Sequence, residues 1–297
     1  MKKALKRLVA AWGRRHPETL VRLRYLLRFH KRLNLNHPVD LNEKIQYLSL
    51  RTDTSAWTRL SDKYVVREYV RELGLEEILN SLYGVWDSAD AIDFDILPER
   101  FILKATHGSG DCLVVQDKNV LDIEKTRDVF RHTLSETYGL AEGNLHYSRI
   151  KPRVVAEELL VNDEWSARHS SSLIDYKMWC FDGKAHYIWV CTNRTKTNCT
   201  QVMTYDRAWN AHPEYSVFNN HYMRGEVIPP PPNLEGMLDI AERLAATFPV
   251  VRVDLYNLNG RIVFGEMTFT SLGGLMNFYT PDFLQKAGSL ISLPALS

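Results

Sequence analysis

The residues best suited to chemistry lie near the C-terminus, in the stretch VVRVDLYNLNGRIVFGEMTFTSLGG at residues 250–274. Two segments of alternating polarity flank Leu-Asn-Gly, a pattern that predicts a β-hairpin. If Arg252, Asp254, Glu266 and Thr268 share one face, the hairpin offers two carboxylates, a guanidinium and a hydroxyl, which suit Mg²⁺ and phosphate groups. The alternative is a set of cross-strand charge pairs on a solvated face.

The register of the hairpin decides which side chains share a face. A two-residue turn at Asn259-Gly260 would pair Leu258 with Arg261 and put the two acids on opposite faces. A three-residue loop, with Gly260 supplying a left-handed bulge, would pair Asn257 with Arg261 and put the acids on one face. We favour the three-residue loop, because it leaves a clean apolar face for the core, formed by Val251, Val253, Leu255, Val263 and Met267.

A glycine-rich loop is the second candidate site. Lys104 closes the short apolar strand 101–104 and is followed by Thr-His-Gly-Ser-Gly-Asp at 106–111. Glycines let backbone N–H groups approach phosphate oxygens, and the lysine adds positive charge. The segment matches neither GxxxxGK[ST] nor GxGxxG, so a tight hairpin turn is an equal alternative.

Two further strands carry charged residues. The strand 154–160 ends in Glu157-Glu158-Leu159-Leu160, which could meet an adenine edge, and Glu164 beyond it could meet a ribose; the alternative is an ordinary strand end. Lys177 lies on the apolar strand 172–180, where an unpaired ammonium would be costly. It therefore needs an anion, either Asp175 or a bound phosphate.

The elements that must position these residues mix helices with strands, and several strands form hairpins. This mixture predicts an α+β fold rather than a purely parallel sheet. The other expected elements are a helix entered at Asp40 or Asn42, a helix at 62–75 ended by Gly74, a strand at 112–115, a helix at 122–138, a strand at 185–192, a four-proline linker at 229–232 and a helix at 234–248.

The N-terminus differs from the rest of the 297-residue chain in charge. Residues 1–33 carry eleven of the 37 Lys and Arg and one of the 36 acids, so the other 264 residues hold 26 basic and 35 acidic side chains. Leu5, Leu8, Val9 and Trp12 fall at helical spacing among the basic residues, which predicts an amphipathic helix broken near Gly13 and Pro17. Such a helix suits a membrane surface or an anionic polymer; the alternative is a helix docked on the body.

The chain shows no secretion signal and no apolar run near the ~20 residues that a membrane span needs. Its four cysteines have no CxxC spacing, which favours free thiols over a disulfide framework or a zinc site. We therefore expect a soluble cytoplasmic protein, at most peripherally bound to the inner face of the membrane.

The sequence also contains a motif that is found in a different class of enzyme. Asp93-Phe-Asp95 is a DxD of the kind that binds the metal of a nucleotide sugar, which would indicate a glycosyltransferase of polysaccharide biosynthesis, although the motif precedes a strand rather than ending one. A non-catalytic nucleotide-gated binding module is the other class. Binding alone would not demand both Asp254 and Glu266, which argues against it.

The order of the charged segments resembles that of ATP-grasp ligases: Asp62-Lys63, Lys104 with its glycine loop, Glu157-Glu158, Lys177, Arg252-x-Asp254 and Glu266-x-Thr268. The run DKYVVREYVRELG resembles a helix of D-alanine–D-alanine ligases. More closely, LNEKIQYL, LPERFILKATHGSGD, IKPRVVAEELL, DYKMWCFDGKAHYI and FPVVRVDLYNLNGRIVFGEMTFT resemble the TupA-type ATP-grasp family, over about residues 34–290.

The resemblance implies a fold and a set of residue roles. Two α+β subdomains would clasp ATP, with a basic helical N-terminal extension, and we place the divisions at residues 1–60, 61–156 and 157–297. The phosphates of ATP would be held by Lys63, Lys104 and Lys177, and covered by the loop His107, Gly108, Ser109 and Gly110. The adenine would meet a hinge formed by Glu157, Glu158, Leu159 and Leu160, and the ribose would meet Glu164. Mg²⁺ would be held by Asp254, Glu266 and Thr268, and the catalytic residues would be Arg252 and Lys104. D-alanine ligases carry Asn where this chain has Thr268, a weaker metal donor.

The resemblance also implies an activity. The protein would be an ATP-dependent carboxylate–amine ligase that forms an acyl phosphate, with ATP and Mg²⁺ as cofactors. Its partners would be an amino acid or amine and a uronic acid or other sugar carboxylate of a cell-surface polysaccharide, and no nucleic acid. This chemistry needs charge neutralisation more than a nucleophilic side chain, which fits a chain without a Ser-His-Asp or Cys-His pattern.

Overall fold

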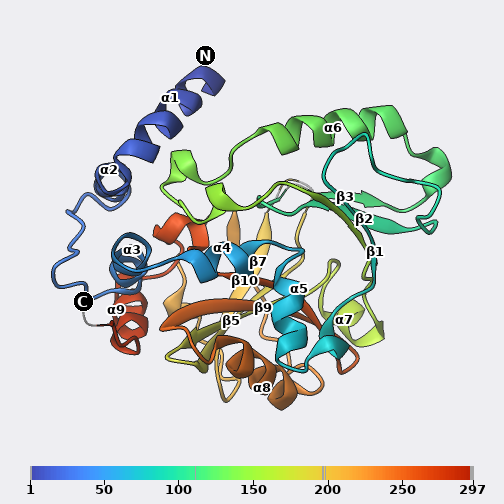
Figure 1. Ribbon diagram of the computed structural model, residues 1–297. Helices are drawn as coiled ribbons and strands as arrows, with labels where there is room; N and C mark the ends of the chain where they lie inside the picture. The colour runs from blue at the N-terminus through green and yellow to red at the C-terminus, as the bar shows by residue number, and fades with distance from the viewer. Residues whose placement is uncertain (1, 111, 196, 198, 295–297) are drawn as a thin grey trace. The chain divides into compact units, whose positions relative to one another are not determined.

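The computed structural model describes residues 2–110, 112–195, 197 and 199–294 (Figure 1). Asp111, the last residue of the expected glycine loop, lies outside this part of the chain. The chain forms two compact units: Met1–Leu20 with Thr54–Leu160, and Val21–Asp53 with Val161–Ser297. Residues 21–53, which we expected in an N-terminal helical region, thus belong to the second unit, and the change between units falls after Leu160.

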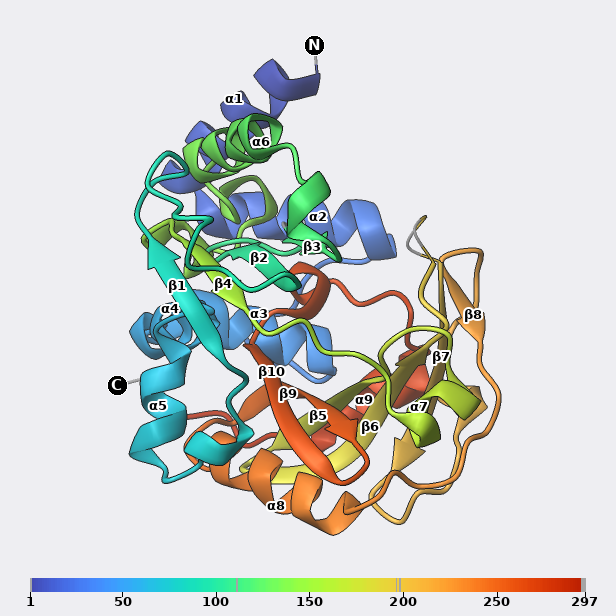
Figure 2. The ribbon, with the colours of Figure 1, turned by 90° about the vertical axis from the view of Figure 1, so that its right-hand side faces the viewer.

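The first unit is built on a four-stranded antiparallel sheet in the order β1-β4-β2-β3. Helix α6 covers one face of this sheet (Figure 2), where its Phe130 joins a core with Phe101, Leu103 and Val154. The elements are α1 (Lys2–Arg15), α4 (Ser55–Ser61), α5 (Val66–Glu72), β1 (Leu82–Trp86), β2 (Phe101–Ala105), β3 (Cys112–Val115), α6 (Ile123–Ser135) and β4 (Val154–Glu157), with short 3₁₀ turns η1 (Glu76–Ile78), η2 (Lys118–Val120), η3 (Leu140–Glu142) and η4 (Tyr147–Arg149). Helix α2 (Pro17–Phe29) contains the first boundary between the units.

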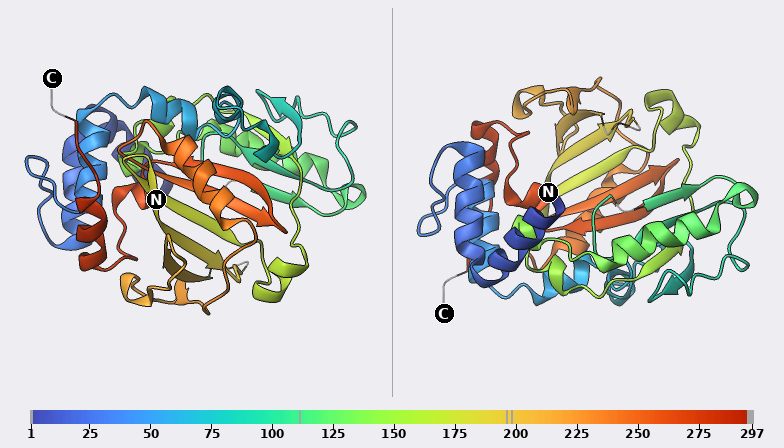
Figure 3. Two further views of the ribbon diagram at one scale, coloured as in Figure 1. Left: turned by 90° about the horizontal axis from the view of Figure 1, so that it is seen from below. Right: turned by 90° about the horizontal axis from the view of Figure 1, so that it is seen from above.

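The second unit is built on a six-stranded sheet in the order β10-β9-β5-β6-β7-β8. All neighbouring strands are antiparallel except β7 and β8. Helix α8 lies across one face, and α3 and α9 lie side by side (Figure 3). The elements are α3 (Leu41–Arg51), α7 (Glu164–His169), β5 (Asp175–Phe181), β6 (Lys184–Thr192), β7 (Thr200–Asp206), β8 (Tyr222–Arg224), α8 (Leu234–Ala245), β9 (Val250–Leu258), β10 (Arg261–Thr268) and α9 (Pro281–Ser289), with η5 (Pro213–Tyr215) and η6 (Ser271–Gly274).

The mixed α+β architecture is as predicted, and so are most elements. Asp40 is the N-cap of α3: its carboxylate accepts from the N–H of Glu43, whose side chain accepts in return from the N–H of Asp40. Two satisfied donors at once favour helix initiation at this point. The expected helix 62–75 is shorter, because the Asp62 carboxylate accepts from the N–H groups of Tyr64 and Val65 and holds a turn before α5 begins.

The expected helix break at Gly13 is wrong. Gly13 is buried inside α1, and the break falls at His16, with Pro17 in the first turn of α2. A Cβ on Gly13 would lie 3.0 Å from the carbonyl oxygen of Leu140 and 2.4 Å from a methyl group of Leu20. The glycine therefore serves close packing of α1 on η3, not termination of a helix.

Helix α1 presents apolar side chains to solvent, since Leu5 is 62% and Leu8 68% exposed. This agrees with the predicted amphipathic helix. None of the helices in the described part of the chain combines the length and the apolar character that crossing a membrane requires.

Candidate active site

The hairpin of β9 and β10 has a different turn from the one we favoured. Leu258 pairs with Arg261, so the loop has two residues, and Asn259 (φ 54°) and Gly260 (φ 90°) both have the positive φ of a type I′ turn. The predicted pairing of Asn257 with Arg261 is therefore wrong. Asn-Gly supplies the two left-handed residues at low cost, which explains the tighter turn.

A β-bulge nevertheless brings the acids to one face. The register shifts between Phe264 and Glu266, after which Glu266 lies opposite Asp254 and Thr268 lies opposite Arg252. The two-residue turn places Val263 opposite Tyr256, so Val263 is not on the predicted core face. Phe264 takes its place there, opposite Leu255. The predicted grouping of the four polar residues is thus confirmed, but a bulge produces it rather than the loop.

Gly265 makes the bulge possible. An added Cβ would lie 2.8 Å from the carbonyl oxygen of Asp254, closer than side-chain carbons come to other atoms. Only a glycine lets the two strands approach here without moving the backbone that carries Asp254 and Glu266.

Arg252 is the centre of the polar face in the second unit. Its Nε and Nη2 donate to the two carboxylate oxygens of Asp254 at 2.6 and 2.8 Å, and its Nη1 donates to the hydroxyl of Ser271 at 2.8 Å. Nη2 also lies 3.3 Å from Glu266 and 3.1 Å from the Thr268 hydroxyl. A guanidinium is the cation best matched to several oxygen acceptors in one plane.

Lys177 has the anion that its apolar strand requires. Its Nζ lies 2.5 Å from Asp254 and 3.7 Å from Asp175, and Asp175 also accepts from Arg194 at 2.5 Å. Burial alone would lower the pKa of Lys177, but the charges of Asp175 and Asp254 raise it. Burial would likewise raise the pKa of Asp254, but Arg252 and Lys177 hold it below its usual value. Both groups are therefore charged at neutral pH.

Glu266 is the open member of this group. Its side chain is 40% exposed, against 4% for Asp254, and one of its oxygens accepts from the Thr268 hydroxyl at 3.1 Å. In the described part of the chain, no three His, Cys, Asp or Glu residues are grouped so that they could hold a metal alone. Two carboxylates and a hydroxyl still fit Mg²⁺, which keeps several waters and completes its shell with substrate phosphates.

A second charged cluster lies in the first unit, around Glu157 at the end of β4. The Glu157 carboxylate accepts from Lys104 at 2.7 Å, from Arg67 at 3.3 Å and from the amide of Asn80 at 3.3 Å. Burial would raise the pKa of Glu157, but the charges of Lys104 and Arg67 lower it. The carboxylate therefore holds Lys104 in place at the end of β2.

The residues after Glu157 leave the strand. Glu158 donates its N–H to the carbonyl of Ser81 at 2.9 Å and accepts from the Ser81 N–H at 3.3 Å, while Leu159 and Leu160 are partly buried. Glu164 lies in α7 of the second unit, fully on its surface, where it pairs with Arg168 at 2.8 Å.

The glycine loop follows β2. His107 and Gly108 are buried and Ser109 and Gly110 are exposed, with Gly110 in the left-handed region (φ 83°). The Lys63 ammonium donates to the carbonyl of Gly108, and Nε2 of His107 lies 3.2 Å from the carbonyl of Glu136. Within this unit the structure thus brings Lys63 to the glycine loop and Lys104 to Glu157.

The family described as TupA-like ATPgrasp matches residues 43–292. The chain belongs to the TupA-like ATP-grasp family. The predicted resemblance and the predicted ATP-grasp fold are confirmed. The predicted enzyme class, an ATP-grasp ligase, agrees with membership of this family.

Among the curated proteins, none matches the chain. Among solved structures, it is similar to the D-alanine–D-alanine ligase of Bacillus anthracis complexed with ATP (13% identity, TM-score 0.47, 80% of this chain and 69% of that one). It is also similar to the ATP-grasp ligase PsnB (10%, 0.40, 74% and 55%) and to phosphoribosylamine–glycine ligase of Thermotoga maritima (10%, 0.40, 73% and 49%). The chain spans 66% of another D-alanine–D-alanine ligase structure from Bacillus anthracis. Family membership rests on the sequence match.

Several residues of this ATP-grasp chain escape sequence reasoning about function. Asn80, Arg194 and Ser271 hydrogen-bond to charged residues of the two clusters, yet each lies 13 to 77 positions from its partners. Arg67 belongs to the ordered series that begins with Asp62-Lys63, but no role is predicted for it from the sequence. The sequence could have indicated only that such partners exist, because a carboxylate buried on a strand, such as Glu157 or Asp175, requires a partner. Asp93 accepts from the N–H of Asp95 at 3.0 Å in an exposed turn, and this local bond uses an oxygen of the DxD motif.

Proposed function

We propose that the protein is an ATP-dependent carboxylate–amine ligase of the acyl-phosphate type. The observation that carries the proposal is the face shared by Arg252, Asp254, Glu266 and Thr268, in a chain that the TupA-like ATP-grasp family matches over residues 43–292. The family indicates a substrate pair drawn from cell-surface polysaccharide biosynthesis: an amino acid or amine, and a uronic acid or another sugar carboxylate. The reaction belongs in the cytoplasm, where ATP is available.

The residues of each unit would do different work. In the first unit, Lys63 and Lys104 bring two ammonium groups to the phosphates, with the backbone of the glycine loop around them. Glu157 fixes Lys104, so the charge is positioned before the nucleotide arrives. Preorganised charge of this kind lowers the barrier to phosphoryl transfer because it need not reorganise during the reaction.

In the second unit, Asp254 and Glu266, with Thr268, would hold Mg²⁺. The metal would neutralise the phosphate oxygens and act as a Lewis acid. The guanidinium of Arg252 and the ammonium of Lys177, which donate to Asp254 in this structure, would also supply positive charge to the transferred phosphoryl group. Both remain charged because their anionic neighbours raise their pKa values.

A product assay tests the proposal. The protein is incubated with Mg-ATP, an amino-acid pool and glucuronic-acid oligosaccharides, and ADP, phosphate and new amides are measured. We expect ADP formation that depends on both acceptors and falls roughly 100-fold in Glu266→Gln, which keeps the shape but removes a metal-binding charge. Glu235→Gln, the same change on the exposed side of α8, should retain full activity.

The glycosyltransferase alternative predicts a different product. Release of nucleoside diphosphate from a nucleotide sugar, abolished by Asp95→Asn, without consumption of ATP would contradict the ligase proposal.

A further inference from the structure

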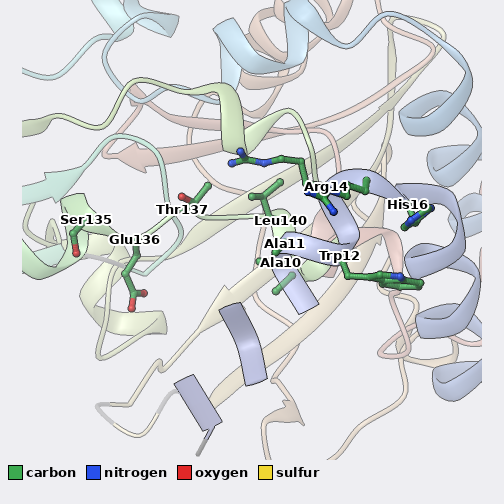
Figure 4. A pocket seen from close by; sticks show the side chains of 11 residues that line it. Ala10, Ala11, Trp12, Arg14, His16, Ser135, Glu136, Thr137 and Leu140 are labelled. Atoms are coloured by element: carbon green, nitrogen blue, oxygen red, sulfur yellow. The ribbon is translucent and has the colours of Figure 1, made fainter. Parts of the chain in front are cut away.

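A cavity of about 700 Å³ lies in the first unit, away from the charged cluster at Glu157. One wall is the C-terminal half of α1, and the other is the segment that follows α6 (Figure 4). Its lining residues are Ala10, Ala11, Trp12, Arg14, Arg15, His16, Ser135, Glu136, Thr137, Leu140 and Ala141.

The lining combines an aromatic face, the positive charge of two arginines, hydroxyl groups and one carboxylate, that of Glu136, which lies 3.6 Å from the ring of His132. Trp12 is 39% exposed, so part of its indole is open to a ligand. Arg14 and Arg15 are exposed in the last turn of α1, and neither has an acidic partner in the described part of the chain. Ser135 and Thr137 add hydroxyl groups on the opposite wall. Guanidinium groups bind carboxylates in a bidentate manner, and an indole face packs against the C–H face of a sugar ring.

Two glycines, Gly13 and Gly139, allow close packing of the backbone around the cavity. Gly13, next to Trp12, lets α1 approach η3, because any larger residue would meet the Leu140 carbonyl at 3.0 Å. On the other wall, Gly139 (φ 86°) makes a turn in which a Cβ would lie 2.4 Å from the carbonyl of Asn144. The approach of Gly13 to Leu140 thus joins the two walls within one unit, and the turn at Gly139 shapes the second wall alone.

The cavity is also joined to the glycine loop. Glu136, which lines it, uses its backbone carbonyl to contact the ring of His107 at 3.2 Å. His107 is adjacent in sequence to Gly108, the residue whose carbonyl accepts from Lys63. The wall of the cavity at Glu136 is therefore in direct contact, through His107, with the loop that we assign to phosphate binding.

We propose that this cavity binds the acidic sugar unit of the acceptor, a uronate-type carboxylate carbohydrate, with the ring on Trp12, the carboxylate on Arg15, which lies on the same face of α1 as Trp12, and Arg14 adding positive charge beside it. The inference rests on the proposed function and names a binding subsite for its substrate. The α1 residues lie outside the family match at 43–292, so the family match alone does not predict this subsite. A volume of about 700 Å³ suits one or two sugar rings better than a single amino acid.

Direct binding to the full-length protein tests the inference without relying on catalysis. Isothermal titration calorimetry would use a glucuronic-acid-containing trisaccharide and the same trisaccharide with its carboxylates reduced to alcohols. We expect the acidic sugar to bind at least about tenfold more tightly than the reduced one, since only the acidic sugar carries a negative charge that can pair with a guanidinium group. The double variant Arg14→Gln/Arg15→Gln, which keeps good helix formers, should abolish this preference.

Two further variants show how much of the binding comes from the indole of Trp12, and whether the loss of any arginine on these helices would weaken it. Trp12→Ala should weaken the binding of both sugars about tenfold. Arg28→Gln, at an exposed position of α2 outside the cavity, is the matched control and should bind both sugars as the native protein does.

The possible results are distinct for the two proposals. Mg-ATP binding without any sugar binding, or equal binding of the two sugars, would overturn this inference and leave the ligase proposal standing. Sugar binding with the expected variant effects but no ATP consumption would support the cavity and contradict the ligase. If Arg14→Gln/Arg15→Gln instead loses only its binding to phosphatidylglycerol vesicles, the helix is a membrane contact and the inference fails.

Discussion

At the scale of single residues, the buried carboxylates of the two charged clusters form ion pairs with Lys and Arg side chains. Glu157 faces Lys104 and Arg67, and Asp254 faces Arg252 and Lys177. The need of Lys177 for an anion could be read from the sequence, because an ammonium on an apolar strand cannot stand alone. Its main partner, Asp254, lies 77 positions away and could not be chosen over Asp175 without the pairing of β5 with β9.

His146 is a buried histidine without such a match. It is 1% exposed, packs edge-on against Trp57 at 5.5 Å, and neither ring nitrogen has a hydrogen-bond partner in the described part of the chain. Burial, assisted by the charge of Arg149, lowers the pKa of His146 from 6.5 to about 3. The folded protein therefore holds this ring neutral where the unfolded chain protonates it.

This predicts a loss of stability in mild acid. Because the folded pKa lies below the unfolded one, the contribution is fully present above 6.5 and is lost as the pH falls toward 3. Between about pH 7 and about pH 5 the loss should be ~2 kcal/mol of unfolding free energy. Urea unfolding at the two pH values measures it, and His146→Phe should show a smaller decrease. An equal decrease in His146→Phe, with His132→Phe at an exposed position as control, would contradict the assignment.

At the scale of elements, the hairpin of β9 and β10 shows how sequence reasoning can reach a correct face through a wrong turn. The alternation of Val251, Val253 and Leu255 required one clean apolar side, and that requirement is met. The Asn-Gly turn is the stronger local signal, but it puts both acids on one face only if a bulge lies within a strand, and the predicted bulge lay in the loop at Gly260. Gly265 was the available signal, since a glycine inside a strand often marks a bulge.

Gly265→Val tests the bulge. The new side chain would collide with the carbonyl of Asp254, so we expect the strands to separate, with a cost of about 1–3 kcal/mol. Mg-ATP affinity should fall at least about tenfold, because Glu266 and Thr268 lose their position opposite Asp254 and Arg252. Calorimetric titration and thermal unfolding give both quantities.

Gly225→Ala is the matched control, since its Cβ would make only ordinary contacts from 3.4 Å. Unchanged Mg-ATP binding in Gly265→Val would show that the bulge does not position the site.

At the scale of the whole molecule, each unit is assembled from separate stretches of chain. Asn42 of α3 exchanges hydrogen bonds with Met276, 234 positions away, which ties residues 21–53 to the second unit. Element types and the family could be predicted, because periodicity and ordered motifs are local. The assignment of the N-terminal segments to different units could not, since it depends on contacts between distant stretches.

Mg-ATP should stabilise the whole protein against heat. A ligand at 100 times its dissociation constant adds ~2.7 kcal/mol to the free energy of unfolding, because it binds only the folded state. Differential scanning calorimetry should show a higher Tm with Mg-ATP, reversed by EDTA and reduced in Glu266→Gln. A Tm that is the same with ATP in EDTA as with Mg-ATP would exclude a metal at Asp254 and Glu266.

The polar face of the second unit is also electrically neutral. Three formal positive charges meet three formal negative charges among its members, Lys177, Arg194, Arg252, Asp175, Asp254 and Glu266. Free Mg²⁺ meets no net attraction there, and the Asp254 oxygens already accept from Arg252 and Lys177. The nucleotide, by contrast, brings anionic oxygens that can take over those cations. We therefore expect an order of addition in which the metal enters together with the nucleotide, as its counterion, and leaves with the product.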